Sequence, residues 1–150
     1  MALPERTWLH HGTPDWVRPD GEIFFVTICA DERGTSRLTE PDVARSLLDA
    51  VRLRHDRGGW WAHLFVIMPD HVHGLFSFPS VGAGMKNTIA GWKRWTARTL
   101  VIGWQDGFFE HRLRSPEGFD EKAHYVRMNP VRAGLVSRME DWPYTWTPPR

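Results

Sequence analysis

The sequence predicts an α+β fold: an antiparallel sheet with helices on one face and one additional helix near the C-terminus. The expected order of elements is β-α-β-β-α-β-α, and its first six match the ferredoxin-like, or RRM-like, split βαβ pattern. Apolar runs at 60–68 and 71–78 are separated by Pro69 and Asp70 alone, so these two strands should form an antiparallel hairpin. The 150 residues are expected to form a single domain.

The first half of the chain supplies one strand and one helix before that hairpin. Residues 22–30, EIFFVTICA, are rich in β-branched and aromatic side chains and predict a strand. Thr39 has the character of a helix N-cap, and the helix after it should end before the glycines of DRGG at 56–59. Apolar residues at helical spacing define its buried face: Val43, Leu47, Leu48 and Val51. Residues 1–20 contain several prolines and little periodicity, which indicates an N-terminal arm.

The second half supplies another helix and strand, and then the additional helix. The helix is expected at about 85–100, with Met85, Ile89 and Trp92 at helical spacing, and the strand at 104–115. The additional helix should start at Ser115, because a capping residue is followed by a proline and an acid.

The additional helix must end or kink near Asn129, because Pro130 disfavours helical geometry in the residue before it. A short helical turn should then stop at Gly134. The proline-rich tail at 141–150 is expected to be irregular.

Bulk composition places the chain among ordinary globular proteins. Its hydrophobic content is 41% and its charged content 25%, and no apolar run is long enough to cross a bilayer. The single cysteine, Cys29, excludes an internal disulfide. The N-terminus lacks the order of a signal peptide, so a cytoplasmic protein is expected.

A local positive stripe stands out against a net charge of only +1. The segment 81–101 carries no acid, and tryptophans are interleaved with its basic residues: Lys86, Trp92, Lys93, Arg94, Trp95 and Arg98. Arginine suits phosphate and tryptophan suits unstacked bases, so the stripe is a candidate DNA contact. On its own, the pattern favours a solvated helix face with core tryptophans.

Two pairs of residues carry the candidate chemistry. His71 and His73, in IMPDHVHGLF, are two apart, so both project from one face of an extended strand. Tyr125 and Asn129 are four apart, so they share a helix face. A helix packed on the sheet would bring the second pair over the first.

This set can perform nucleophilic chemistry on a phosphodiester. A tyrosine hydroxyl can act as a covalent nucleophile, and a divalent metal held by two imidazoles and an amide oxygen could polarise the phosphorus. Purely structural roles stay open: Tyr125 as a core residue, Asn129 as a helix terminator and the histidines as solvent-facing residues. A single-stranded nucleic-acid-binding module and a metallohydrolase that uses water as its nucleophile are the alternative functions.

The motifs resemble those of the single-tyrosine HUH transposases, also described as IS200-like. VIMPDHVHGLF is similar to the MPNHVH signature of that group, and FFEHRLRS, YVRMNPVRAGLV and DWPYTW resemble segments of its REP-associated tyrosine transposase branch. The resemblance runs from about residue 25 to residue 146, in the same order and at the same separation.

The resemblance implies a role for each of the four residues. His71, His73 and Asn129 would hold Mg²⁺ or Mn²⁺, and Tyr125 would attack DNA to give a 5′-phosphotyrosine link and a free 3′ hydroxyl. Ligand chemistry alone would favour manganese or zinc over magnesium, because magnesium prefers oxygen ligands.

The resemblance also implies the partner, the fold and an association with the bacterial nucleoid. The substrate would be single-stranded DNA with a palindromic hairpin, as in REP repeats, and a monomer is favoured over a dimer. The implied HUH nuclease fold agrees with the element order. The candidate DNA contacts are Lys86, Trp92, Lys93, Arg94, Arg98, Arg112, Arg114 and Arg132.

Two residues depart from the family pattern. Asp70 stands where asparagine is commoner, and Gly74 replaces a large apolar residue. The other tyrosine, Tyr144, lies in the tail and is not the expected nucleophile. The sequence assigns no role to Asp70, Glu121 or His111.

Overall fold

The computed structural model describes residues 13–17, 22–79, 84–113 and 116–149. Five strands form one sheet in the order β4-β1-β3-β2-β5, and every pairing is antiparallel. The strands are β1 (Ile23–Cys29), β2 (Trp61–Ile67), β3 (His71–Ser77), β4 (Phe109–Leu113) and β5 (Thr145–Trp146). The helices are α1 (Pro41–Asp56), α2 (Gly84–Leu100), α3 (Pro116–Arg127) and α4 (Asn129–Arg132).

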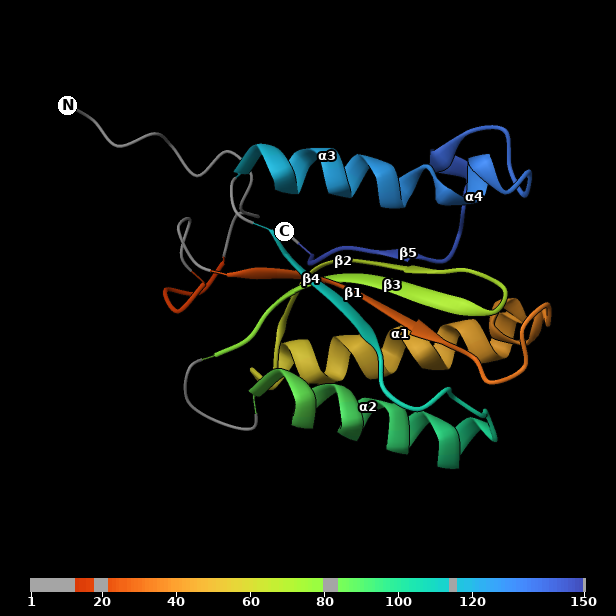
Figure 1. The fold of residues 1–150 in the computed structure, drawn as a ribbon, viewed down its shortest axis with the longest axis horizontal. Helices are drawn as coiled ribbons and strands as arrows, with labels where there is room; N and C mark the ends of the chain where they lie inside the picture. The colour runs from red at the N-terminus through yellow and green to blue at the C-terminus, as the bar shows by residue number, and fades with distance from the viewer. Residues whose placement is uncertain (1–12, 18–21, 80–83, 114–115, 150) are drawn as a thin grey trace.

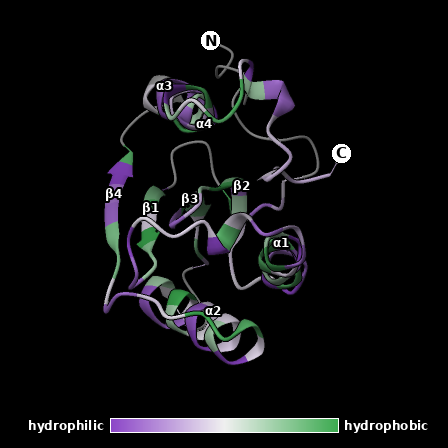
Figure 2. Cartoon of the chain, turned by 90° about the vertical axis from the view of Figure 1, so that its right-hand side faces the viewer, coloured by the Kyte–Doolittle hydropathy of each residue, from purple (hydrophilic) through white to green (hydrophobic). Residues whose placement is uncertain are grey.

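The sheet is the middle layer of three (Figure 1). Helices α1 and α2 cover one face, as the sequence predicts, and α3 and α4 lie over the opposite face. Figure 2 shows the same layers from the side, with β4 at the edge next to β1. The α+β prediction, with an antiparallel sheet and an additional C-terminal helix, is confirmed.

Each face of the sheet has its own apolar cluster. The cluster under α1 and α2 includes Leu47, Trp60, Phe65, Phe76 and Trp92. The cluster under α3 includes Leu64, Val66, Leu75, Phe119 and Val126. Because strand residues alternate, β3 sends Val72 and Phe76 into the first cluster and Leu75 into the second. In the described part of the chain, no helix is both long and apolar enough to cross a bilayer.

The helix after the first strand begins one residue later than predicted. Thr39 ends a 3₁₀ turn, Arg37–Thr39, and its hydroxyl donates to the Ser36 carbonyl at 3.2 Å. Glu40 is the N-cap and Pro41 is the first helical residue. Proline explains the shift, because it fits the first helical position and keeps the residue before it extended.

The fourth strand is shorter than the predicted 104–115. Among the described residues of that range, 104–113, only Phe109–Leu113 is strand, and Trp104 makes an isolated bridge with Ala30. Gly107, at φ 73°, turns the chain between them. The Ser115 cap, Arg114 and most of the expected arm at 1–20 lie outside the described residues.

The tail is more ordered than predicted. After a second 3₁₀ turn, Met139–Asp141, strand β5 pairs with β2, and Trp142 Nε1 donates to the Ile67 carbonyl at 3.0 Å. These contacts occupy an edge of β2 that would otherwise be unpaired.

We expect Gly74→Ala to destabilise the protein by about 1–3 kcal/mol, because a Cβ there would lie 2.2 Å from Cε2 of the Phe76 ring. Gly91→Ala on α2 is the matched control. Its Cβ would meet only Arg54 Nη2, at 3.8 Å, so the better helix former should add about 0.5–1 kcal/mol. Urea unfolding measures both changes, and a neutral Gly74→Ala would show that the ring yields.

Candidate active site between the sheet and α3

His71 and His73 project from β3 toward α3, as the alternation predicts. The register pairs His73 with Thr27, and His71 with Cys29, on the neighbouring strand β1. Leu75, two residues further along β3, is buried in the cluster under α3. The two imidazoles therefore share that face of the sheet.

His73 is fixed by contacts with β1. Its Nδ1 lies 2.9 Å from Thr27 Oγ1, and its ring stacks on Phe25 with centroids 5.2 Å apart. Burial, with the charges of His71, Lys122 and Arg132, lowers the pKa of His73 to about 3. The ring is therefore neutral at neutral pH, and when Nδ1–H donates to Thr27, Nε2 keeps a lone pair.

His71 is fixed by Asp70, which answers the open question about that residue. The Asp70 carboxylate accepts from His71 Nδ1 at 2.7 Å and from the Gly34 amide at 2.9 Å, and it forms an ion pair with Arg33, whose Nε lies 3.1 Å away. Burial raises the pKa of Asp70, but the Gly34 and His71 hydrogen bonds and the Arg33 charge outweigh it and hold the pKa below its usual range. Asp70 thus orients His71, and Nε2 is again the nitrogen left for a ligand.

The two rings fit one metal ion. Their centroids are 4.7 Å apart with an interplanar angle of 74°. Two imidazoles that bind one ion at about 2.1 Å and roughly at right angles would have centroids roughly 4.5 Å apart. Neutral imidazole is the form that ligates metal, which the low pKa of His73 supplies. In the described residues, no three His, Cys, Asp or Glu side chains gather as a metal site, so a third ligand has to be of another kind.

Tyr125 lies on α3 and is 51% exposed, so it is not a core residue. Two cations flank its ring: Arg132 Cζ is 4.0 Å and Lys122 Nζ 5.1 Å from the ring centroid. Lys122 Nζ also lies 4.8 Å from the Phe25 ring, on which His73 stacks. Lys122 therefore joins the tyrosine of α3 to the histidine side of the sheet.

Asn129 is the first residue of α4, and α3 ends at Arg127. The chain is thus broken near Asn129 as predicted, and Tyr125 and Asn129 do not share one continuous helix. Arg132 links them instead, because its Nη2 donates to the Tyr125 carbonyl and to Asn129 Oδ1, the latter at 3.0 Å. Asn129 Oδ1 keeps a second lone pair that can serve a metal ion.

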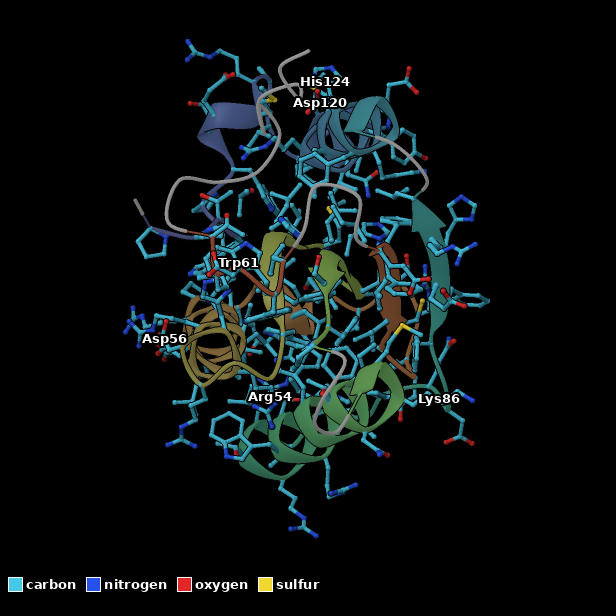
Figure 3. The ribbon with its side chains drawn as sticks, turned by 90° about the vertical axis from the view of Figure 1, so that its left-hand side faces the viewer. Arg54, Asp56, Trp61, Lys86, Asp120 and His124 are labelled. Atoms are coloured by element: carbon cyan, nitrogen blue, oxygen red, sulfur yellow. The ribbon has the colours of Figure 1, made fainter. Side chains whose placement is uncertain are left out.

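The basic stripe of α2 does not border these residues. Trp92 is fully buried against Phe65 and Trp104, so it is a core residue and has no free face for a base. Trp95, 41% exposed, is the tryptophan that α2 leaves at the surface. Lys86 lies across the sheet from α3 (Figure 3), and the exposed Arg94 and Arg98 belong to the same helix.

The remaining basic candidates differ in their surroundings. Lys93 donates to the carbonyls of Gln105 and Gly107 at 2.8 and 2.7 Å, so its ammonium holds a loop. Arg112, on β4, pairs with Glu22 at 2.8 Å. Of the seven predicted contacts that the structure describes, which leaves out Arg114, Arg132 alone is shown beside Tyr125.

Three further side chains near the site were not predicted: Thr27, Arg33 and Lys122. Thr27 could have been found, because antiparallel pairing of the first and third strands places one residue of β1 beside each histidine. Lys122 precedes Tyr125 by three residues, which is a helical neighbour position. Arg33 carries no such signal. His124 points away from the sheet on α3 (Figure 3), and Glu121 is exposed.

Comparison with known proteins identifies one group of relatives. No family model matches the chain. The chain is 26% identical over 130 residues to the REP-associated tyrosine transposase of Escherichia coli K12, covering 83% of this chain and 75% of that protein. It is 27% identical over 141 residues to a Haemophilus influenzae protein that is provisionally named a REP-associated tyrosine transposase, covering 83% of this chain and 79% of that protein.

The same group appears among solved structures. The structure of a REP-associated tyrosine transposase bound to a REP hairpin superposes with a TM-score of 0.73, at 21% identity, over 91% of this chain and 82% of that one. The fold is therefore that of a tyrosine transposase. The resemblance to the REP-associated tyrosine transposases is confirmed in sequence and in fold.

We expect the metal-free protein to lose stability on acidification, and His73 to account for part of the loss. The pKa of His73 is about 3 in the folded chain and about 6.5 when unfolded, so between these values only the unfolded chain is protonated there. The contribution of His73 is therefore favourable above about pH 6.5 and falls by about 1.4 kcal/mol per pH unit below it.

Urea unfolding in EDTA at pH 7, 6 and 5 measures this effect. His73→Asn should flatten the profile, and the exposed His124→Asn should leave it unchanged. An equally steep profile in His73→Asn would contradict the assignment.

Proposed function

We propose that the protein is a single-stranded DNA endonuclease and strand transferase of the transposase type, with Tyr125 as nucleophile. The observation that carries the proposal is that one chain gathers two imidazoles, an exposed tyrosine and two cations on one side of the sheet. The relatedness to REP-associated tyrosine transposases supports it.

The tyrosine chemistry is a transesterification. The Tyr125 oxygen forms a bond to phosphorus, and the bond from phosphorus to the 3′ oxygen breaks. The phenol proton passes to solvent base, and the departing 3′ oxygen takes up a proton. The products are a 5′-phosphotyrosine and a free 3′ hydroxyl. Because the bond energy is kept in the protein link, a second 3′ hydroxyl can reverse the step and join strands without ATP.

His71 and His73 present their Nε2 atoms as ligands, and Asn129 offers the third through its amide oxygen. A divalent ion such as Mg²⁺ or Mn²⁺, when bound there, would polarise the phosphodiester. Asp70 and Thr27 hold the two rings through Nδ1, so the ligand atoms need no reorientation.

Lys122 and Arg132 supply positive charge beside the nucleophile. Both lie over the Tyr125 ring, and Arg132 is tied to the backbone of α3. A phosphate approaching Tyr125 would meet both cations, which would offset the charge that develops on its oxygens.

The proposed substrate is single-stranded DNA that carries a REP-type hairpin, because the structural relative is described as bound to a REP hairpin. We also propose that the protein acts as a monomer. Lys122 lies near the rings of both Tyr125 and Phe25, and His73 of the same chain stacks on Phe25, which favours attack by the tyrosine of the same copy.

We expect Tyr125→Phe to abolish covalent attachment, by at least about 10³-fold, and to leave DNA binding largely intact, because only the attacking oxygen is lost. The measurement is a denaturing gel after incubation with Mg²⁺ or Mn²⁺ and labelled hairpin DNA from repeats beside the gene. His71→Ala should also lose the adduct. Tyr144→Phe is the matched control and should retain it.

The same gel separates the alternatives. Cleavage without a labelled protein band would indicate water as the nucleophile. Binding with neither cleavage nor adduct, under either metal, would leave a single-strand recognition module. An undiminished adduct in Tyr125→Phe would refute the role of Tyr125.

A further inference from the structure

Phe109 is an exposed aromatic ring on the same face of the sheet as the histidines. It is 69% exposed although it belongs to a strand. Phe109 pairs with Thr27, and Thr27 pairs with His73, so the three side chains project in one direction. Neighbouring strands are about 4.8 Å apart, which places Phe109 about 10 Å from His73.

A cavity of about 170 Å³ lies beside this ring. Cys29 lines it on β1, together with five consecutive residues, 105–109. Cys29 is the register partner of His71. The cavity thus extends from the edge strand to the strand that borders both histidines.

The loop that lines the cavity is held in place from behind by α2. Lys93 Nζ donates to the carbonyls of Gln105 and Gly107, at 2.8 and 2.7 Å. Trp104 Nε1 donates to Thr96 Oγ1 at 3.0 Å, and the Gln105 amide donates to the Cys29 carbonyl at 2.9 Å. These bonds join the loop to two other elements, so the cavity is preformed.

We propose that Phe109 and this cavity bind one unstacked nucleobase, that of a nucleotide next to the phosphodiester attacked by Tyr125. The inference rests on the proposed function, because that function sets where the phosphodiester lies. Aromatic rings at the surface are the usual platforms on which proteins stack single-stranded bases.

The polar lining favours a base over a phosphate. Asp106 is among the residues that line the cavity; its negative charge disfavours phosphate there, and its carboxylate can accept a hydrogen bond from the exocyclic amino group of a base. The Gln105 side chain offers both a donor and an acceptor. Cytosine, adenine and guanine carry such amino groups, so thymine should be the least favoured occupant.

The test is a binding cycle between Phe109 and individual bases. It uses Tyr125→Phe protein, so that equilibrium is not disturbed by cleavage, and labelled hairpin DNA with single-stranded flanks. A single abasic site is moved along the flanks, one nucleotide at a time. Phe109→Ala should weaken binding of the intact DNA by about 5- to 150-fold, the range for one stacked base. When the abasic site is at the nucleotide whose base stacks on Phe109, Phe109→Ala should cause no further loss of binding.

Two variants control the result. Phe109→Trp keeps a stacking face and should bind intact DNA within a few-fold of the parent. Trp95→Ala removes an exposed aromatic from α2, across the sheet, and should show no dependence on the position of the abasic site. Equal binding by Phe109→Ala, or an equal loss on every abasic DNA, would overturn the subsite.

Failure of the proposed function gives a different pattern. If the protein with Tyr125 intact forms no tyrosine adduct but the cycle still locates one base at Phe109, the subsite stands without the chemistry. If the adduct forms and the cycle shows no coupling, the chemistry stands without the subsite.

Discussion

Both histidines of the candidate site are anchored through Nδ1, and the rest of the site depends on that. Asp70 holds His71, and Thr27 holds His73, at 2.7 and 2.9 Å. Each ring is thereby left with Nε2 as the nitrogen available to a ligand. Asp70 in turn contacts Arg33 and the Gly34 amide, so its carboxylate oxygens already have partners within the protein. These contacts indicate that Asp70 orients the His71 ring rather than serving as a metal ligand itself.

The second constraint is the division of labour between the faces of the sheet. Alternation along β3 sends Val72 and Phe76 into the larger core, which α1 and α2 cover, and leaves the histidines on the α3 side. The α2 helix therefore lies on the other side of the sheet from the histidines, and its Lys93 holds the 105–107 loop through hydrogen bonds to the Gln105 and Gly107 carbonyls. Its exposed basic residues lie across the sheet from Tyr125, and any DNA that contacts them must pass around an edge.

Much of this arrangement could be predicted from the sequence, because it depends on periodicity. The strands, the hairpin and the common face of His71 and His73 follow from alternation, and the break near Asn129 follows from Pro130. The helical spacing of Trp92 from Met85 and Ile89 also predicts that Trp92 is buried. The prediction of Trp92 as a DNA contact is wrong, because its side chain is fully buried. Spacing indicates which residues share a helix face, but the packing decides which face is buried.

Other features were outside the reach of local pattern. The helix cap is Glu40 rather than Thr39, because Pro41 occupies the first helical position. Strand β5 is two residues long and exists because β2 has an edge to cover. Asp70 forms an ion pair with Arg33, which is remote in sequence, so no local pattern predicts this contact. Lys122 gains its place from the packing of α3 over Phe25.

The most direct test of the central claim is a Mn²⁺ titration of the metal-free protein, followed by NMR of its aromatic side chains. The ion broadens resonances near its binding site. The account predicts that the ring signals of His71 and His73 broaden first, with those of Tyr125, and that His71→Ala removes the effect. Broadening that begins at the exposed His124 or His111 instead, with His71, His73 and Tyr125 unchanged, would contradict a metal-assisted tyrosine site between β3 and α3.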